Sequence, residues 1–519
     1  MTTPAHLGDV LRAAAETHGA TDAYVEVGDG GGRRRLTFAE WDAAADAAAL
    51  CLAERGVGRG DVVCLLLPPS ISYAVAYLGA ARLGAVTSGI NLRLGPDERV
   101  AVLARLRPAV SVVDDVAGAG PDRQLGRGEL DAATAQAVAD VGAGRDRRRP
   151  PSPSLGLDDP VAVVWTSGST GVPKGALFRH GALAAVAAGS DVLSQEGDRR
   201  LAPIPFAHVG YMTRPWDEIT HRVTTVITPQ PWTAAAAIEL LASERCTVGQ
   251  GVPTQWALVL AHPDLAGADL GSLRIAATGG ARVPPELVRA MRLRLGCPVV
   301  VRYTSTEASL GTGTVPGDPD EVVATTVGRP VPGVELALVD EDGAPVAPGA
   351  VGRVRLRSAA VMAGYVSTGT VVDPKATAAA LDAAGWVTTG DLGRVGDDGN
   401  LRLVGRAGDM YIRGGYNVHP SEVETVLGEH PAVDQAAVVG VADPVLGEIG
   451  VVFVVVGAGA AAPTLGELRA LVAGRLADYK APDRLVVVAE LPVTAMGKID
   501  KRQLRRQAEA PTVVPAGEE

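Results

Sequence analysis

Over the first hundred or so residues, the apolar positions follow two patterns in turn: helical spacing, and short continuous runs. At 36–56 the apolar side chains recur at helical spacing behind a candidate N-cap, Thr37, and residues 72–85 also favour a helix. The runs at 61–68 and 109–115 are short and almost continuously apolar, which indicates buried strands. Helices that alternate with such strands predict α/β layers with a parallel sheet.

Strand-like runs return after a stretch of weak pattern between 117 and 158. The runs at 160–165, 273–281 and 297–309 continue the α/β organisation. From about 328 to 404, short strand-like runs are joined by frequent Gly, Pro and Asp, which predicts a small β-subdomain or barrel.

A compact α+β unit is expected after Asp409. Residues 419–431 predict a helix that begins with a capping box formed by Ser421 and Glu424. Two strands, a further helix and a last strand follow, and the polar tail that ends the chain is expected to be disordered.

The bulk composition excludes several classes of protein. A chain of 519 residues is too long for one core, so two to four domains are expected. The net charge of -11 argues against a broad basic face, and no nucleic-acid partner is expected. Four cysteines without CxxC spacing or a histidine cluster fit a reducing cytoplasm. We expect neither a signal peptide nor an integral membrane segment, since no apolar run reaches the ~20 residues of a spanning helix.

The segment TSGSTGVPKG gathers hydroxyls, glycines and one of only five lysines directly after the run at 160–165. Glycines permit positive φ, so backbone N–H groups can curl into a nest for an anion. The order is not that of a Walker A loop, in which Gly-Lys-Ser/Thr follows four spacers. A polyphosphate site is favoured over a flexible Gly/Ser loop. The candidate residues are Thr166, Ser167, Gly168, Ser169, Thr170, Gly171 and Lys174.

TSGSTGVPKGA resembles the phosphate loop of the acyl-adenylate-forming enzymes, which include acyl-CoA synthetases, nonribosomal-peptide adenylation domains and beetle luciferases. Other signatures of this family follow in the expected order, from about residue 36 to 506. The resemblance implies an α/β fold: a large N-terminal domain of α/β layers with a small β-barrel subdomain, then a small mobile α+β C-terminal domain. The implied boundaries are 1–408 for the N-terminal domain (subdomain about 328–404), Asp409 for the hinge, 410–506 for the C-terminal domain and 507–519 for a disordered tail.

The resemblance also implies which residues bind Mg·ATP. The loop 166–174 would hold the β- and γ-phosphates. YTSTE resembles a Tyr-Gly-x-Thr-Glu motif in which Tyr303 would stack on adenine, Thr306 would bind the α-phosphate and Glu307 would ligate Mg²⁺, an ion that prefers carboxylate and phosphate oxygens. Thr304 replaces the glycine of that motif, which would reshape the acyl pocket or weaken adenylation. TGGA matches the segment that lines the adenine and acyl pocket, Gly279, Gly280 and Ala281.

Two later motifs complete the implied nucleotide and coenzyme A contacts. In TTGDLG, Asp391 would accept hydrogen bonds from the ribose hydroxyls, and Arg406 would contact the ribose or a phosphate. Asp409 stands at the hinge position of the family. Gly414 and Gly415 would let the backbone approach the pantetheine arm of coenzyme A.

The remaining implied residues act on the acid. LPVTAMGKIDKRQL resembles the C-terminal motif whose lysine, here Lys498, reaches the carboxylate and the α-phosphate during adenylation. A point charge on a flexible stem suits a pentavalent phosphoryl centre. PIPFAHVGYM resembles the aromatic motif that would place Phe206 and His208 by the acyl group. A structural role for His208 stays open.

The expected function is that of an acid–CoA ligase. It would join a small-molecule carboxylic acid to ATP, with Mg²⁺, as an acyl-adenylate and then pass the acyl group to coenzyme A. Alternatives are an enzyme that performs one half-reaction, one that loads a separate carrier protein and, in another class, a non-catalytic nucleotide-binding protein. The identity of the acid and the oligomeric state, including a homodimer, are left open.

Overall fold

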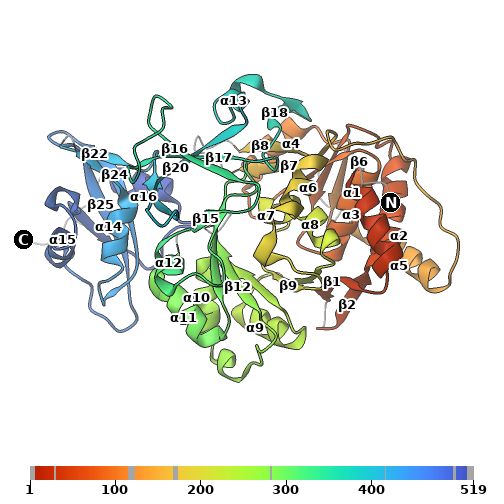
Figure 1. Cartoon of the computed structure of the whole chain (residues 1–519), viewed down its shortest axis with the longest axis horizontal. Coiled ribbons are helices and arrows are strands. Elements are labelled where there is room, and N and C mark those ends of the chain that lie inside the picture. Colours follow the sequence, from red (N-terminus) through yellow and green to blue (C-terminus); the bar gives the residue numbers. More distant parts are fainter. Residues whose placement is uncertain are drawn as a thin grey trace, which may run out of the picture. The chain divides into compact units, whose positions relative to one another are not determined.

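The computed structural model describes residues 6–28, 31–114, 123–166, 173–280, 283–414, 416–494 and 498–510 (Figure 1). The chain divides into two compact units that are interleaved along the sequence. The large unit comprises 1–337, 355–389 and 399–401, and the small unit comprises 338–354, 390–398 and 402–519, within the described ranges. The domain limits and the hinge at Asp409 expected from the sequence stay predictions.

One sheet of the large unit has eight strands in the order β19-β18-β8-β7-β4-β3-β5-β6. Its strands are β3 (Val62–Leu66), β4 (Val86–Gly89), β5 (Val110–Val113), β6 (Arg123–Gly126), β7 (Pro160–Thr166), β8 (Lys174–Arg179), β18 (Gly364–Thr368) and β19 (Val371–Val372). The strands from β7 to β6 pair in parallel, whereas β8, β18 and β19 add an antiparallel edge.

The other sheet of the large unit has nine strands in the order β15-β14-β13-β12-β11-β9-β10-β1-β2. They are β1 (Asp22–Val27), β2 (Arg33–Thr37), β9 (Arg199–Ala202), β10 (Thr224–Ile227), β11 (Val248–Gly251), β12 (Ile275–Gly279), β13 (Val299–Tyr303), β14 (Thr312–Gly313) and β15 (Arg329–Pro330). The strands from β13 to β1 are parallel, so their carboxyl ends share one edge of the sheet.

Helices of the large unit pack on both faces of the two sheets. They are α1 (Leu7–His18), α2 (Phe38–Glu54), α3 (Ile71–Arg82), α4 (Pro96–Leu106), α5 (Arg127–Gly142), α6 (His180–Ala188), α7 (Val209–Met212), α8 (Pro215–Thr220), α9 (Ala234–Ser243), α10 (Pro253–Ala261), α11 (Pro285–Leu295), α12 (Asp320–Thr325) and α13 (Pro374–Ala378), with short 3₁₀ turns η1 (Asp191–Leu193) and η2 (Pro263–Gly267). The predicted Thr37 cap of α2 is confirmed, because Thr37 and Glu40 form a capping box.

Successive side chains of a strand point to opposite faces of the sheet, so the cores that they join show which helices cover each face. Val63 of β3 belongs to the core that contains α1, α2, α3 and Tyr24 of β1, so these helices lie between the two sheets. Cys64 points the other way, into a core shared with α4. Val25 of β1 joins the core of α9, α10 and α11. The large unit therefore has five layers, α/β/α/β/α, and the predicted α/β layers are confirmed.

The segment predicted as β-rich, about 328–404, contributes to three sheets, since its first strand, β15, belongs to the nine-stranded sheet. The strands β16 (Glu335–Val339), β17 (Gly352–Arg357), β20 (Trp386–Val395) and β21 (Leu401–Arg406) form a four-stranded sheet in that order. The described strands form no closed barrel, since this sheet has two ends. The strands β18 and β19 of the same segment instead extend the eight-stranded sheet of the large unit.

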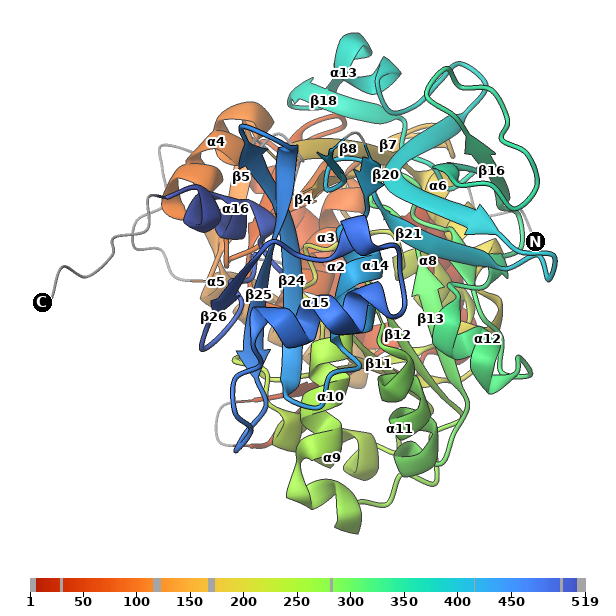
Figure 2. The same ribbon diagram turned by 90° about the vertical axis from the view of Figure 1, so that its left-hand side faces the viewer.

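The last part of the small unit is an α+β sandwich, as predicted (Figure 2). Its strands are β22 (Tyr411–Arg413), β23 (Tyr416–Val418), β24 (Val433–Asp443), β25 (Gly447–Val456) and β26 (Arg484–Val487), and its helices are α14 (Pro420–Leu427), α15 (Leu465–Ala473) and α16 (Lys501–Glu509), with a 3₁₀ turn η3 (Asp478–Lys480). Val438 and Val452 face α14 and α15, whereas Val439 and Phe453 face α16. The helix α16 enters the segment expected to be a disordered tail, of which 511–519 lie outside the described residues.

The predicted capping box of α14 is wrong. The N-cap is His419, and no side chain caps this helix. The Ser421 hydroxyl donates instead to the backbone oxygen of Val404, and the Glu424 carboxylate accepts from the backbone N–H of Val438. These two side chains tie α14 to neighbouring strands rather than to its own first turn.

Candidate active site

Both ends of the predicted phosphate loop are anchored by the eight-stranded sheet. Thr166 ends β7 and faces Lys174, the first residue of β8, across the antiparallel pair. Trp165 donates from Nε1 to Ser88 Oγ (2.9 Å), and Arg105 of α4 donates to the backbone oxygen of Pro173 (3.0 Å). The loop residues between these ends, Ser167, Gly168, Ser169, Thr170 and Gly171, lie outside the described residues, so the anion nest stays a prediction.

A lysine and a glutamate from distant motifs contact one tyrosine. The Lys174 Nζ lies 5.2 Å from the centroid of the Tyr365 ring, and the Tyr365 hydroxyl donates to Glu307 Oε1 (2.6 Å). Burial raises the pKa of Tyr365, and the Glu307 carboxylate raises it further. The phenol therefore keeps its proton at neutral pH and remains a hydrogen-bond donor.

Glu307 fits the role of a lone carboxylate for Mg²⁺. Its backbone oxygen accepts from Met362 N (2.8 Å), which fixes the start of the side chain. One carboxylate oxygen accepts from Tyr365, and the side chain is only partly buried. A single carboxylate is sufficient, since Mg²⁺ takes most of its ligands from phosphate and water. No cluster of three or more His, Cys, Asp or Glu side chains suited to a metal occurs among the described residues.

Tyr303 and Thr304 stand at the carboxyl end of β13. Tyr303 is buried, and its hydroxyl donates to Thr389 Oγ1 (3.3 Å). Thr304 is exposed and donates to the backbone oxygen of Ser305 (3.2 Å). Its φ is not positive, so the departure from the family glycine causes no backbone strain here. Thr306, partly buried, follows in the same turn.

Two glycines at the end of β12 have separate structural requirements. A Cβ on Gly279 would lie 2.2 Å from the backbone oxygen of Arg302, its partner on β13. Gly280 has φ +77°, a conformation that favours glycine. Close strand approach and a sharp turn thus explain both residues, while Ala281 of the same motif lies outside the described residues.

His208 caps a helix in the structure. Its Nδ1 accepts from the backbone N–H of Gly210 (3.1 Å) at the start of α7. Phe206 is buried and stacks on Tyr211, with ring centroids 3.6 Å apart, and meets the edge of Tyr73. A structural role is therefore visible for both residues, and their position by the acyl group stays a prediction.

In the small unit, Asp391 and Arg406 form an ion pair (Oδ1 to Nε, 3.1 Å). The Asp391 side chain is mostly buried, and that of Arg406 is mostly exposed. Gly414 has φ +57° and donates to the backbone oxygen of Leu446 (2.8 Å), a conformation that suits glycine. Gly415 lies outside the described residues.

Lys498 of the small unit is bound through its backbone to Thr494. The backbone oxygen of Lys498 accepts from Thr494 N (2.7 Å), and its N–H donates to Thr494 Oγ1 (3.3 Å). Its side chain is exposed. Two other lysines of the small unit form ion pairs: Lys480 pairs with Glu422, and Lys501 pairs with Glu424 (2.6 Å). The position of Lys498 suits a lysine that reaches a ligand, and its role stays a prediction.

Two family models match most of the chain. The AMP-binding enzyme model matches residues 11–366, and the model of the AMP-binding enzyme C-terminal domain matches 422–498. The chain belongs to the AMP-binding enzyme family. This membership confirms the resemblance seen in the sequence.

Known members of the family align with this AMP-binding enzyme over nearly their full length. Indoleacetate--CoA ligase of Aromatoleum aromaticum is 35% identical over 494 residues, which cover 91% of this chain and 93% of that protein. Long-chain-fatty-acid--CoA ligase FadD13 of Mycobacterium tuberculosis is 31% identical, with 97% and 99% covered. The amide bond synthetase McbA of Marinactinospora thermotolerans is 30% identical and superimposes with a TM-score of 0.81, with 97% and 99% covered. The predicted AMP-forming acid–CoA ligase and α/β fold are confirmed.

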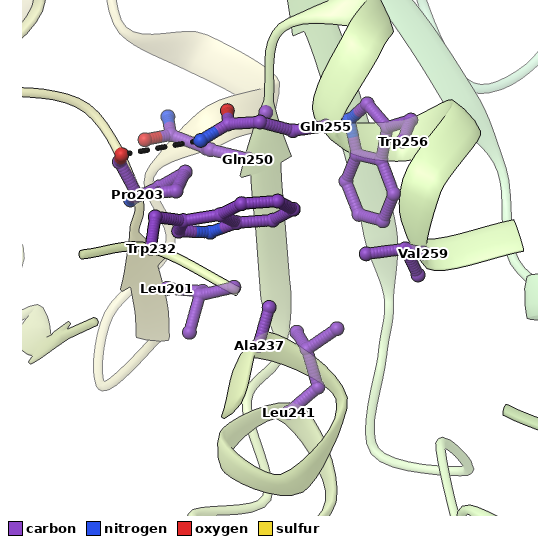
Figure 3. Close-up of a pocket in the computed structure, with 10 residues that line it drawn as sticks. Leu201, Pro203, Trp232, Ala237, Leu241, Gln250, Gln255, Trp256 and Val259 are labelled. Atoms are coloured by element: carbon purple, nitrogen blue, oxygen red, sulfur yellow. Dashed lines mark hydrogen bonds between the residues drawn. The ribbon is translucent and has the colours of Figure 1, made fainter. Parts of the chain in front are cut away.

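A small apolar pocket of the enzyme lies where β9 and β11 end, next to α9 and α10 (Figure 3). Trp232 and Trp256 line it, and Gln255 Nε2 donates to the backbone oxygen of Pro203 beside them (3.3 Å). Its volume of about 10 Å³ admits one water molecule, too little for an acyl group. None of the helices in the described ranges is long and apolar enough to cross a membrane.

Proposed function

We propose that this enzyme activates a small-molecule carboxylic acid with Mg·ATP and transfers the acyl group to the thiol of coenzyme A. The observation that carries the proposal is the contact of Lys174 and Glu307 with one tyrosine beside the anchored loop. A cation for phosphate oxygens and a carboxylate for a metal ion are the two charges that an Mg·ATP complex requires. Four cysteines without disulfides support a cytoplasmic enzyme.

In the first half-reaction, the substrate carboxylate attacks the α-phosphorus and pyrophosphate leaves. The carboxylate is already a nucleophile, so catalysis consists of placement and charge neutralisation rather than proton removal. Thr166 and Lys174 hold the leaving phosphates, and Glu307 would hold the ion. The metal ion, when bound, supplies positive charge to the phosphate oxygens. Tyr303 positions the adenine.

The residues of the small unit complete the proposed cycle. Asp391 accepts from the ribose hydroxyls beside Arg406. Lys498 neutralises the carboxylate and the α-phosphate during adenylation only. In the second half-reaction, Gly414 and Gly415 admit the pantetheine arm, the thiol attacks the acyl carbonyl and AMP leaves. A rotation at Asp409 separates the two steps.

The acyl acceptor has a second candidate. The likeness to an amide bond synthetase, at 30% identity over 97% of the chain, favours an amine as an alternative to the thiol. The identity of the acid is not assigned, because the relatives are named for acids as different as indoleacetate and long-chain fatty acids.

The experiment offers a panel of aryl, alicyclic and fatty acids with Mg·ATP and measures pyrophosphate, thioester and amide separately. We expect acid-dependent pyrophosphate release without an acceptor and thioester formation when coenzyme A is added. Amide formation without thioester formation would show that the acyl acceptor is an amine rather than coenzyme A. ATP binding without pyrophosphate release for any acid, and no thioester from the preformed adenylates, would overturn the proposal in favour of a nucleotide-binding protein.

A further inference from the structure

We infer that Tyr365 is a positioning residue that holds the Glu307 carboxylate for the divalent cation and the Lys174 ammonium for the phosphates. The inference rests on the proposed function, which gives Glu307 and Lys174 these roles. The sequence motifs do not include Tyr365, and its two contacts join residues from different strands.

The register of the sheet places Tyr365 beside Lys174. Tyr365 of β18 lies opposite Ala176 of β8, and Ala176 is two residues from Lys174 on the same face of the strand. Such a diagonal neighbour is within reach of a long or aromatic side chain. Tyr365 N donates to Thr377 Oγ1 (3.0 Å), and its backbone oxygen accepts from Asp373 N (2.7 Å). Tyr365 is only 6% exposed, and its ring is therefore held in one place.

The segment around Tyr365 also fixes Glu307 at two points. Met362 binds the backbone oxygen of Glu307, and the Tyr365 hydroxyl binds its Oε1. No hydrogen bond from the described residues reaches Oε2, so this oxygen remains for a cation. A hydrogen bond from outside the coordination sphere typically changes metal affinity about 10- to 100-fold, because it orients the ligand.

The phenol also keeps two opposite charges apart. Lys174 forms no ion pair within the described residues, although the same tyrosine contacts both Lys174 and Glu307. An ammonium over the ring face is stabilised by the ring quadrupole, and the carboxylate by the hydroxyl. Each charge thus has a partner and is still available to the nucleotide complex.

The test compares Tyr365→Phe with the wild-type enzyme by titrating Mn²⁺ in the presence of ATP and following free Mn²⁺ by electron paramagnetic resonance. The variant keeps the ring and loses the hydroxyl. We expect Mn²⁺ affinity to fall about tenfold, with metal-free AMP binding unchanged. Tyr365→Leu also loses the ring, so it should bind ATP more weakly than Tyr365→Phe does. Tyr77→Phe is the matched control, since it removes a buried tyrosine hydrogen bond to Met212 elsewhere and should leave Mn²⁺ affinity unchanged.

Glu307→Gln separates the inference from the function it rests on. If Glu307→Gln leaves Mn²⁺ affinity unchanged, the proposed metal role of Glu307 is wrong. If Glu307→Gln weakens the affinity and Tyr365→Phe does not, only the role of Tyr365 is wrong. Equal losses of Mn²⁺ and metal-free AMP binding in Tyr365→Phe would show that the tyrosine merely supports the fold, which would also overturn the inference.

Discussion

The Asp391 carboxylate lies 3.1 Å from the Arg406 guanidinium, where β20 and β21 supply one residue each. Because the Arg406 side chain is 58% exposed, the pair contributes little to folding, about 0–1 kcal/mol. The pair contributes to the site instead, because it holds a carboxylate and a cation side by side. Ribose hydroxyls are donors and would take the carboxylate as their acceptor.

We predict that Asp391→Asn raises the KM for ATP about tenfold and leaves the melting temperature nearly unchanged. The amide keeps the shape but loses the charge that strengthens hydrogen bonds to the ribose. Steady-state kinetics with thermal unfolding check this. The matched control is Asp398→Asn, which breaks the neighbouring pair with Arg402 (2.8 Å) and should not change the KM. An equal rise in both variants would contradict the ribose role.

Lys498→Ala separates the two half-reactions. We expect ATP–pyrophosphate exchange to fall at least about 100-fold, because the lysine neutralises charge that develops during adenylation. Thioester formation from preformed acyl-adenylate should stay near the wild-type rate. Lys375→Ala, another exposed lysine outside the motifs, is the control and should preserve both rates. The split of roles is refuted by an equal loss of both half-reactions in Lys498→Ala.

Gly279→Ala tests the close approach of β12 and β13. The new Cβ would meet the Arg302 backbone oxygen at 2.2 Å, so the strands must separate. We expect the free energy of unfolding to fall by about 2–4 kcal/mol. Urea denaturation gives the value. Gly317→Ala, in an open turn with no atom within 4 Å of the new Cβ, should change it by less than about 0.5 kcal/mol. A similar small change at Gly279 would show that the strands adapt.

The parts of the fold that the sequence predicted are those with strong apolar contrast. The strand β3 is continuously apolar, and α2 begins at a capping box, so both were found. The helix α5 was missed because few large apolar residues mark its buried side, which is formed by Leu130, Thr134 and Ala137. Alanine and threonine bury well but give a weak pattern.

The sequence-based prediction is wrong where a side chain has more than one possible hydrogen-bond partner. Ser421 fits a cap by spacing, yet a strand carbonyl takes its hydroxyl. In the site, the motif residues follow from resemblance, but Tyr365 depends on the pairing of β18 with β8, two strands far apart in the chain. Local sequence carries no signal for such a contact. Tertiary pairing therefore decides which side chain supports Glu307.

His221 makes part of the stability depend on pH. The Asp217 carboxylate, 2.9 Å from Nδ1, raises the pKa of His221 above its usual 6.5. A raised pKa means that the stabilisation is complete below the unfolded value and is lost as pH rises through the folded value. We predict that His221→Gln lowers the free energy of unfolding by up to about 1 kcal/mol more at pH 5.5 than at pH 8.5. Urea titrations at both pH values check this, and an equal loss at both would contradict it.

Thr304→Gly tests whether the residue that departs from the family motif selects the acid. The side chain is exposed after β13, and its removal clears a methyl and a hydroxyl beside the turn that carries Thr306 and Glu307. We expect kcat/KM for a bulky acid to rise about tenfold relative to a slim one, the scale of small steric changes in a pocket. The KM for ATP should stay within about twofold, and stability should fall by about 0.5–1 kcal/mol from added chain freedom. An equal change for both acids would assign Thr304 to adenylation rather than to selection.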